Sequence, residues 1–147
     1  MTNFVPGELW LTLYLGEGYW LAGDADRATR TLQQCLQLGE RCRMTVFIGC
    51  AHRLLGEIAA SSDAVESQIP LAVSHLDQSV TIFTSINAEN ELALSYAAYG
   101  RVCTQQNRIL EARDHLARAL AIFERLGTFR EPERVRDDLA NLATQST

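Results

Sequence analysis

Apolar residues recur along this 147-residue chain at the three- and four-residue spacing of amphipathic helices. Glycine, proline and short polar runs interrupt that spacing where a helix would begin or end. The pattern predicts about seven helices, over about residues 6–22, 24–42, 45–60, 70–87, 89–105, 108–126 and 131–143. Asp24 is predicted to cap the second helix, and Gly127 to follow the end of the sixth. The polar stretch from 61 to 68 is predicted to be a turn.

One helical-hairpin pattern occurs three times in register. Each copy has a glycine in its first helix and an alanine followed four residues later by a leucine in its second. The glycines are Gly16, Gly56 and Gly100, and the pairs are Ala28 with Leu32, Ala72 with Leu76 and Ala112 with Leu116. The glycines are 40 and then 44 residues apart, whereas the alanines are 44 and then 40 apart. The second hairpin therefore carries a four-residue insertion in its turn.

This repetition predicts an all-α fold, a right-handed α-solenoid of stacked hairpins in which the glycines lie at close helix crossings. The hairpins would cover about residues 9–42, 45–86 and 89–126. A capping helix over about 131–143, with Val135, Leu139 and Leu142 on its narrow apolar stripe, would close the array. We expect a single domain over residues 1–147 that is a fragment of a longer chain.

Composition narrows the classes of function. The formal net charge is -5 and the chain has no basic stripe, which argues against nucleic-acid binding. The four cysteines lack C-x-x-C spacing and fall on apolar helical positions, which predicts free thiols in a reducing compartment. The most apolar run, residues 9–15, is too short to cross a bilayer. We therefore expect a cytoplasmic protein that makes no membrane contact.

No catalytic constellation stands out. The sequence contains no G-x-x-x-x-G-K-[ST] phosphate loop, no G-x-S-x-G nucleophile turn and no H-E-x-x-H zinc motif. His75 and His115 hold equivalent positions in successive hairpins, and His52 lies in a helix of the other class. Equivalent side chains on stacked helices are too far apart to share a metal unless they reach toward each other. We expect no enzyme activity, no bound metal and no cofactor.

The hairpin pattern resembles the tetratricopeptide repeat. The likeness rests on the Leu-Gly or Tyr-Gly pair of each first helix and the Ala-x3-Leu motif of each second helix, and it covers about residues 9–126. Two features depart from that family: the period is about 40 residues, and the proline that usually ends the second helix is missing. This long-helix variety is similar to C-terminal regions of bacterial signalling proteins, including nucleotide cyclases with an AAA-type ATPase module and STAND-class activators. In those proteins the helical region binds regulators or effectors.

The resemblance also implies where a partner would bind, because first helices line the concave surface of tetratricopeptide folds. The groove positions that carry over include Trp10, Leu13, Glu17, Trp20 and Leu21 in the first repeat, Arg53 and Glu57 in the second and Arg101 in the third. The family's carboxylate clamp cannot be assembled from the residues at these positions. A receptor for chaperone tails is therefore not expected.

The first helix is unusual because it is apolar on opposed faces. Leu11, Leu15 and Tyr19, with Gly16 close by, are expected to pack against the next two helices. The opposite face carries Trp10, Leu13, Tyr14, Trp20 and Leu21, interrupted only by Glu17. A helix that is apolar all round is normally covered. The cover could be a preceding repeat or an N-terminal segment, a second copy of the chain, or a bound peptide or ligand.

The sequence therefore favours a non-catalytic module that binds a protein partner or assembles as a homo-oligomer, and that serves as the regulatory region of a larger bacterial signalling protein. Two alternatives remain open. The first is a small-molecule effector sensor that binds its ligand in the concave groove. The second is a scaffold that dimerises through its first helix.

Overall fold

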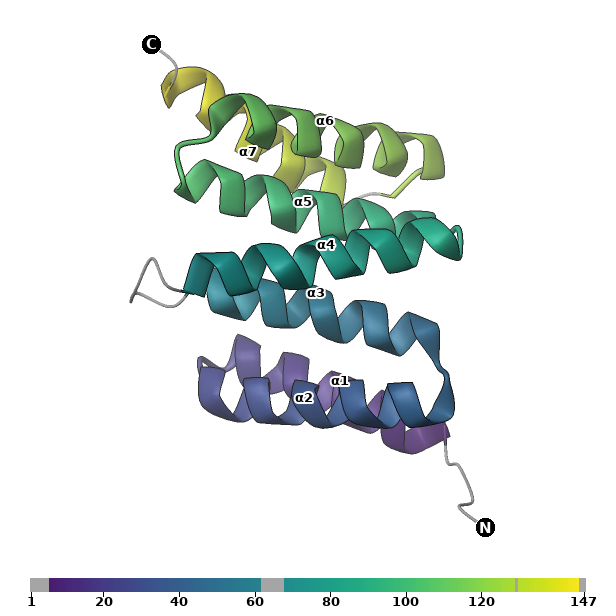
Figure 1. The fold of residues 1–147 in the computed structure, drawn as a ribbon. Helices are drawn as coiled ribbons and strands as arrows, with labels where there is room; N and C mark the ends of the chain where they lie inside the picture. Colours follow the sequence, from purple (N-terminus) through teal and green to yellow (C-terminus); the bar gives the residue numbers. More distant parts are fainter. Residues whose placement is uncertain (1–5, 62–67, 129, 146–147) are drawn as a thin grey trace. The chain divides into compact units, whose positions relative to one another are not determined.

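The computed structural model describes residues 6–61, 68–128 and 130–145, and within these ranges it is all-α. Its helices are α1 (Pro6–Leu21), α2 (Ala25–Cys42), α3 (Thr45–Ser61), α4 (Ile69–Ser85), α5 (Glu89–Gln105), α6 (Ile109–Leu126) and α7 (Arg130–Gln145) (Figure 1). The predicted helices and their order are confirmed, with ends that differ by two residues or fewer. Most of the predicted turn at 61–68 lies outside the described residues.

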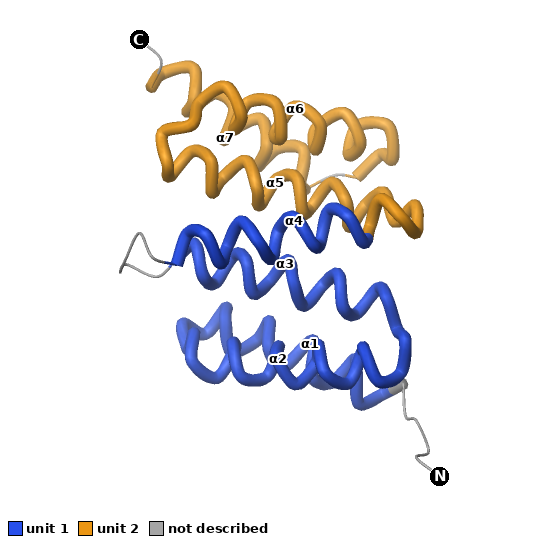
Figure 2. The backbone as a smooth tube through the Cα atoms, viewed as in Figure 1, with its two compact units in different colours: residues 1–82 blue, residues 83–147 orange. Residues whose placement is uncertain are grey.

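The chain forms two compact units, residues 1–82 and residues 83–147 (Figure 2). In the first unit, α1 pairs with α2, and α3 packs against both of them. The N-terminal part of α4 lies against α3, where Leu76 approaches Gly56. In the second unit, α5 pairs with α6, and α7 packs mainly on α6 and also touches α5. Each unit therefore contains antiparallel helical hairpins of the predicted kind.

The helix ends follow from local chemistry. The Asp24 carboxylate accepts a hydrogen bond from the backbone N–H of Arg27 at 3.0 Å, which confirms it as the N-cap of α2. The second helix of each hairpin is followed by a residue in the left-handed region. These equivalent residues are Arg43 with φ 56°, Asn87 with φ 55° and Gly127 with φ 72°. A residue that follows the second helix thus has a positive φ in all three hairpins, even in the first, where it is an arginine.

Close glycine crossings join the two helices of each hairpin. A Cβ atom built on Gly16 would lie 2.7 Å from the side chain of Leu32, and one built on Gly56 would lie 2.8 Å from Leu76. The third crossing repeats the contact, at 2.6 Å from Leu116 to a Cβ on Gly100. A side chain at any of these glycines would force the helices apart. The prediction that the three glycines lie at close crossings is confirmed.

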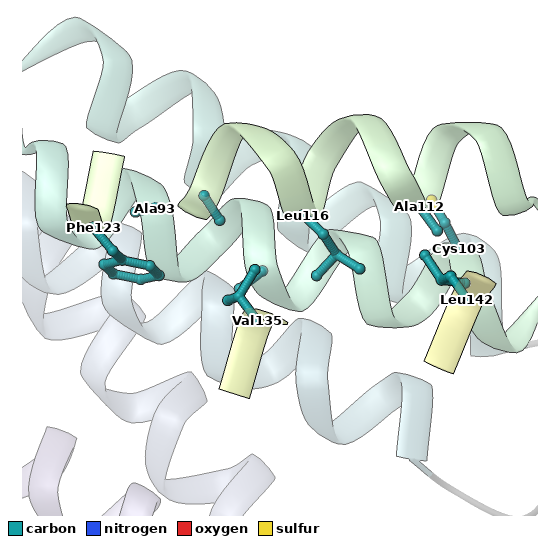
Figure 3. Close-up of a cluster of buried hydrophobic side chains, with 9 residues drawn as sticks. Ala93, Cys103, Ala112, Leu116, Phe123, Val135 and Leu142 are labelled. Atoms are coloured by element: carbon teal, nitrogen blue, oxygen red, sulfur yellow. The ribbon is translucent and has the colours of Figure 1, made fainter. Parts of the chain in front are cut away.

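The core of the second unit is built by the same spacing. Its buried residues are Ala93, Ala97 and Cys103 from α5, Ala112, Leu116, Ala119 and Phe123 from α6, and Val135 and Leu142 from α7. Figure 3 shows these side chains meeting between the helices. Val135 and Leu142 are fully buried, so α7 covers the last hairpin with the apolar stripe predicted for it.

The predicted packing face of α1 was wrong. Leu11 and Leu15 were expected to face the neighbouring helices, but they are 59% and 43% exposed. The buried stripe instead contains Leu9, Leu13 and Gly16. Because nearly every position of α1 is apolar, the sequence gives no polar face from which the buried direction could be read.

The glycine crossings can be tested with one substitution at two sites. Gly56→Ala should lower the free energy of unfolding by about 1–3 kcal/mol, because its Cβ would meet Leu76 and the carbonyl of Ala72. Gly18→Ala is the matched control, since a Cβ there meets nothing within 4 Å. That control should raise stability by about 0.5–1 kcal/mol through helix propensity. Urea unfolding in dilute solution measures both, and equal effects at the two sites would contradict the crossing.

Arg43 gives a second stability test. A non-glycine residue in the left-handed region carries a steric cost, and the equivalent position in the last hairpin is Gly127. We expect Arg43→Gly to raise the free energy of unfolding by about 0.5–1 kcal/mol, after the extra freedom of glycine in the unfolded chain is subtracted. The same unfolding assay measures it. A loss of stability would mean that the Arg43 side chain makes a contribution larger than its backbone strain.

Candidate functional site

In the described part of the chain, α1 carries more exposed large apolar side chains than any other helix. Helical residues advance by about 100° each, so positions can be placed around the axis from the sequence. The buried and half-buried residues of α1 occupy one half of the circle. The other half presents exposed Trp10, Leu11, Tyr14, Leu15 and Leu21, together with Gly18. Only one charged residue, Glu8, lies in that exposed half, at its edge.

Two of these aromatic rings are held in place by their neighbours. The Trp10 ring stacks on Tyr14, with centroids 5.4 Å apart, and meets Phe47 of α3 edge to face at 4.9 Å. Phe47 itself is buried, whereas Trp10 and Tyr14 remain 48% and 59% exposed. The cluster therefore joins α1 to α3 and still offers two large rings to solvent. We call Trp10, Tyr14 and Phe47 the aromatic cluster.

The other residues predicted in the first repeat lie in different settings. Leu13 is buried and belongs to the packing stripe, so it offers no surface to a partner. Glu17 and Trp20 are half-buried, while Leu21 is strongly exposed at the end of α1. Trp10 and Trp20 thus differ in position, although the sequence had placed them on one face.

The charged residues predicted in the second and third repeats form ion pairs within the chain. Arg53 donates to the Glu57 carboxylate at 2.8 Å, one turn away on α3, and both side chains are largely covered. Arg101 of α5 donates through Nε to Asp138 of α7 at 2.9 Å. This ion pair joins α5 to α7. A partner would meet these arginines as partly neutralised ion pairs.

A cavity of about 570 Å³ lies elsewhere in the first unit, between α2, α3 and α4. Its lining includes Arg30 and Asp26 from α2, Leu55 and Ile58 from α3, and His75 from α4. None of the residues predicted to bind a partner lines it. The concave groove predicted from the sequence and this cavity are therefore different places.

A histidine pair lies beside this cavity and was missed by the sequence reasoning. Nδ1 of His52 and Nδ1 of His75 are 2.9 Å apart, so one ring donates its N–H and the other accepts. His52 lies one turn before Gly56 and His75 directly precedes Leu76. The Gly56–Leu76 crossing therefore sets the two rings side by side. The contact could have been predicted from the sequence by aligning the two helices at the Gly56–Leu76 crossing.

Burial controls the titration of the reactive groups. It lowers the pKa of His52 to about 4, helped by the charge of His75, and it also lowers the pKa of His75. It raises the pKa of the Cys35 and Cys103 thiols, which keeps them protonated and poorly nucleophilic at neutral pH. Within the described ranges, no three His, Cys, Asp or Glu side chains gather as a metal site would require. The helices seen there are also too short or too polar to cross a bilayer.

These features define an all-α helical-repeat protein with an exposed apolar first helix. A family model described as Tetratricopeptide repeat matches residues 47–125, which is more than half of the chain. The chain therefore belongs to the tetratricopeptide-repeat family. Such repeats generally mediate protein–protein interactions and are typically non-catalytic. A search of curated proteins found no match.

The histidine pair makes stability depend on pH. The unfolded chain takes up a proton at His52 near pH 6.5, while the folded chain resists it down to about pH 4. Stability should therefore fall as the pH falls, by about 2 kcal/mol between pH 7 and pH 5 from His52 alone. His52→Asn keeps a group that can bond His75 and removes this titration, so it should lose less. Urea unfolding at both pH values measures the difference, and an unchanged loss in the variant would contradict it.

Proposed function

We propose that this chain is a non-catalytic protein-binding module whose docking surface is formed by the aromatic cluster and the exposed Leu21 at the end of α1. The observation that carries the proposal is the exposure of Trp10. Its ring is fixed by Tyr14 and Phe47 and still leaves about half of its surface open. Tryptophan and tyrosine are enriched among the residues that dominate binding energy, because they bury large areas at little cost in conformational entropy.

The surroundings favour a partner with an apolar face. Leu21 extends the surface toward the end of α1, and Glu8 is the single charged residue in the exposed half of this helix. The Arg53–Glu57 pair on α3 is internally compensated and leaves little net charge to attract a small ion. An amphipathic helix that lays its apolar stripe on a hydrophobic surface is a common solution for such a site. We therefore propose a protein segment of this kind as the partner, in preference to a small polar effector.

We also propose that the module acts as the regulatory region of a larger cytoplasmic signalling protein. The support is the resemblance of its long second helices and 40-residue period to the C-terminal repeats of bacterial signalling proteins. A binding module without chemistry of its own would act there by changing the state of a catalytic domain when a partner docks. The proposal depends on the presence of the predicted partner surface on α1.

The docking surface can be tested by placing a photo-crosslinking phenylalanine derivative at Tyr14, which is well exposed beside Trp10. The matched control places it at Leu110 of α6, which is 79% exposed outside the proposed surface. After illumination in cells, a partner should be crosslinked from position 14 and not from position 110. The affinity of the purified partner is then measured by calorimetry. Trp10→Ala should weaken binding at least about tenfold, since hot-spot residues contribute about 2 kcal/mol or more.

Circular dichroism provides the folding control for these variants. Trp10→Ala should keep the helical content of the parent, because α1 retains its buried stripe of Leu9, Leu13 and Gly16. Tyr14→Ala, which removes a more exposed ring, is the second variant if Trp10→Ala melts early. A partner that binds both variants as tightly as the parent would contradict the proposed surface.

A further inference from the structure

The outer strip of α1, which we define as Leu11, Leu15 and Gly18, lies beside the aromatic cluster but faces another direction. Its equivalents can be found in α3, because Gly16 and Gly56 are 40 residues apart in the repeat. They are Ala51, Leu55 and Ile58, and all three are buried. In α1, Leu11 and Leu15 are about half exposed, and a Cβ on Gly18 would meet nothing within 4 Å.

The side of α1 that corresponds to a packed side of α3 is exposed. α3 packs against the hairpin before it, α1 and α2, and its equivalents of the outer strip are buried. Among the described residues of the first unit, no hairpin packs against the corresponding side of α1. The outer strip is therefore as apolar as a surface that packs against another helix, yet it is exposed to solvent. Large contiguous apolar patches of this kind commonly mark interaction sites.

We propose that a second copy of this chain covers the outer strip, with the two α1 helices packed antiparallel around a twofold axis. In a symmetric contact of this kind the same patch serves on both sides and the assembly closes at two copies. The inference does not depend on the proposed function, because it uses different side chains of α1.

The distribution of apolar surface favours a second α1 as the occupant. Among the described residues, the other exposed large apolar side chains occur singly or in pairs on different helices, whereas α1 carries five. Helix α7 offers no apolar match to α1, because its exposed positions include Glu133, Arg134, Arg136 and Asp137. A contact of α1 with α7 would cover these charged side chains with apolar ones, which costs desolvation energy. Within the described chain, α1 is the surface best suited to cover α1.

The charges and the shape of α1 are compatible with an antiparallel pair centred between Tyr14 and Leu15. In that register Leu11 of each copy lies opposite Gly18 of the other, where the missing side chain leaves room for it. The two Glu8 side chains are then separated by 13 residues of helix, or about 20 Å at 1.5 Å per residue. That is about twice the screening length at 0.1 M salt, so their repulsion is small.

The size of the contact predicts a reversible dimer. α1 has 16 residues and is therefore about 24 Å long. Two helices of this length form a contact below the standard size of stable interfaces, about 1,600 Å² in total. We expect a dissociation constant on the order of micromolar.

Sedimentation of the 147-residue chain tests the proposal from roughly 1 μM to roughly 500 μM, a range that brackets micromolar affinity. The mean mass should rise from 16.4 kDa toward twice that value. Leu11→Glu combined with Leu15→Glu should hold the mass at 16.4 kDa throughout. Leu110→Glu, which places the same charge on an exposed leucine of α6, should dimerise like the parent.

Gly18→Ala provides a variant whose effects on folding and association have opposite signs. It should raise the melting temperature in dilute solution, because alanine favours the helix, and it should weaken the dimer about fivefold or more by filling the space for Leu11. A parent chain that remains monomeric throughout would overturn the proposal in favour of a preceding hairpin or another protein. A dimer that survives the paired glutamates, or that Gly18→Ala tightens, would overturn it as well.

Discussion

The contact between a glycine of the first helix and a leucine of the second sets the geometry of every hairpin in this protein. Leu32, Leu76 and Leu116 are completely buried. Each lies so close to its glycine that a Cβ atom on the glycine would clash with the leucine side chain. The alanines one turn earlier, at Ala28, Ala72 and Ala112, are completely buried too. Small residues thus bring the two helix backbones together, and the leucine fills the space between them. The Ala-x3-Leu spacing is the sequence form of this contact.

The same crossing places polar chemistry in the interior. Because Leu76 must lie against Gly56, the residues next to them in the helices, His75 and His52, are brought within hydrogen-bonding distance. Each ring satisfies one nitrogen of the other, which offsets part of the cost of burying them. The pair exists in its neutral form because burial opposes the charged form. The packing at the Gly56–Leu76 crossing thus creates a pH-sensitive contact between two histidines that belong to no catalytic motif.

The helices, their order and the glycine crossings could be predicted from the sequence because they depend on local spacing. The apolar stripe of α7 could be predicted for the same reason, since Val135, Leu139 and Leu142 follow helical spacing on an otherwise largely polar helix. The packing face of α1 could not, because a helix that is apolar all round contains no polar reference direction. Contacts such as Arg101 with Asp138, which are 37 residues apart, depend on how α7 folds back.

The sequence predicted only part of the candidate surface. Trp10 and Tyr14 were placed on an exposed face, and both are exposed, but Leu13 turned out to belong to the core. Phe47, which fixes the Trp10 ring, was missed because its contact with α1 crosses from one hairpin to the next. The buried equivalents of the outer strip in α3 give the clearest indication that α1 is an unfinished packing surface. Its completion by another molecule is the central claim about this protein.

Hydrogen exchange measured at several protein concentrations tests that claim most directly. Amides of α1 open more rarely when the exposed face of the helix is covered, so their exchange reports the cover itself. If a second copy covers α1, exchange over residues 9–21 should slow as the concentration rises, while exchange over 109–126 in α6 stays constant. If α1 exchanges at the same rate at every concentration, the helix is not completed by a second copy.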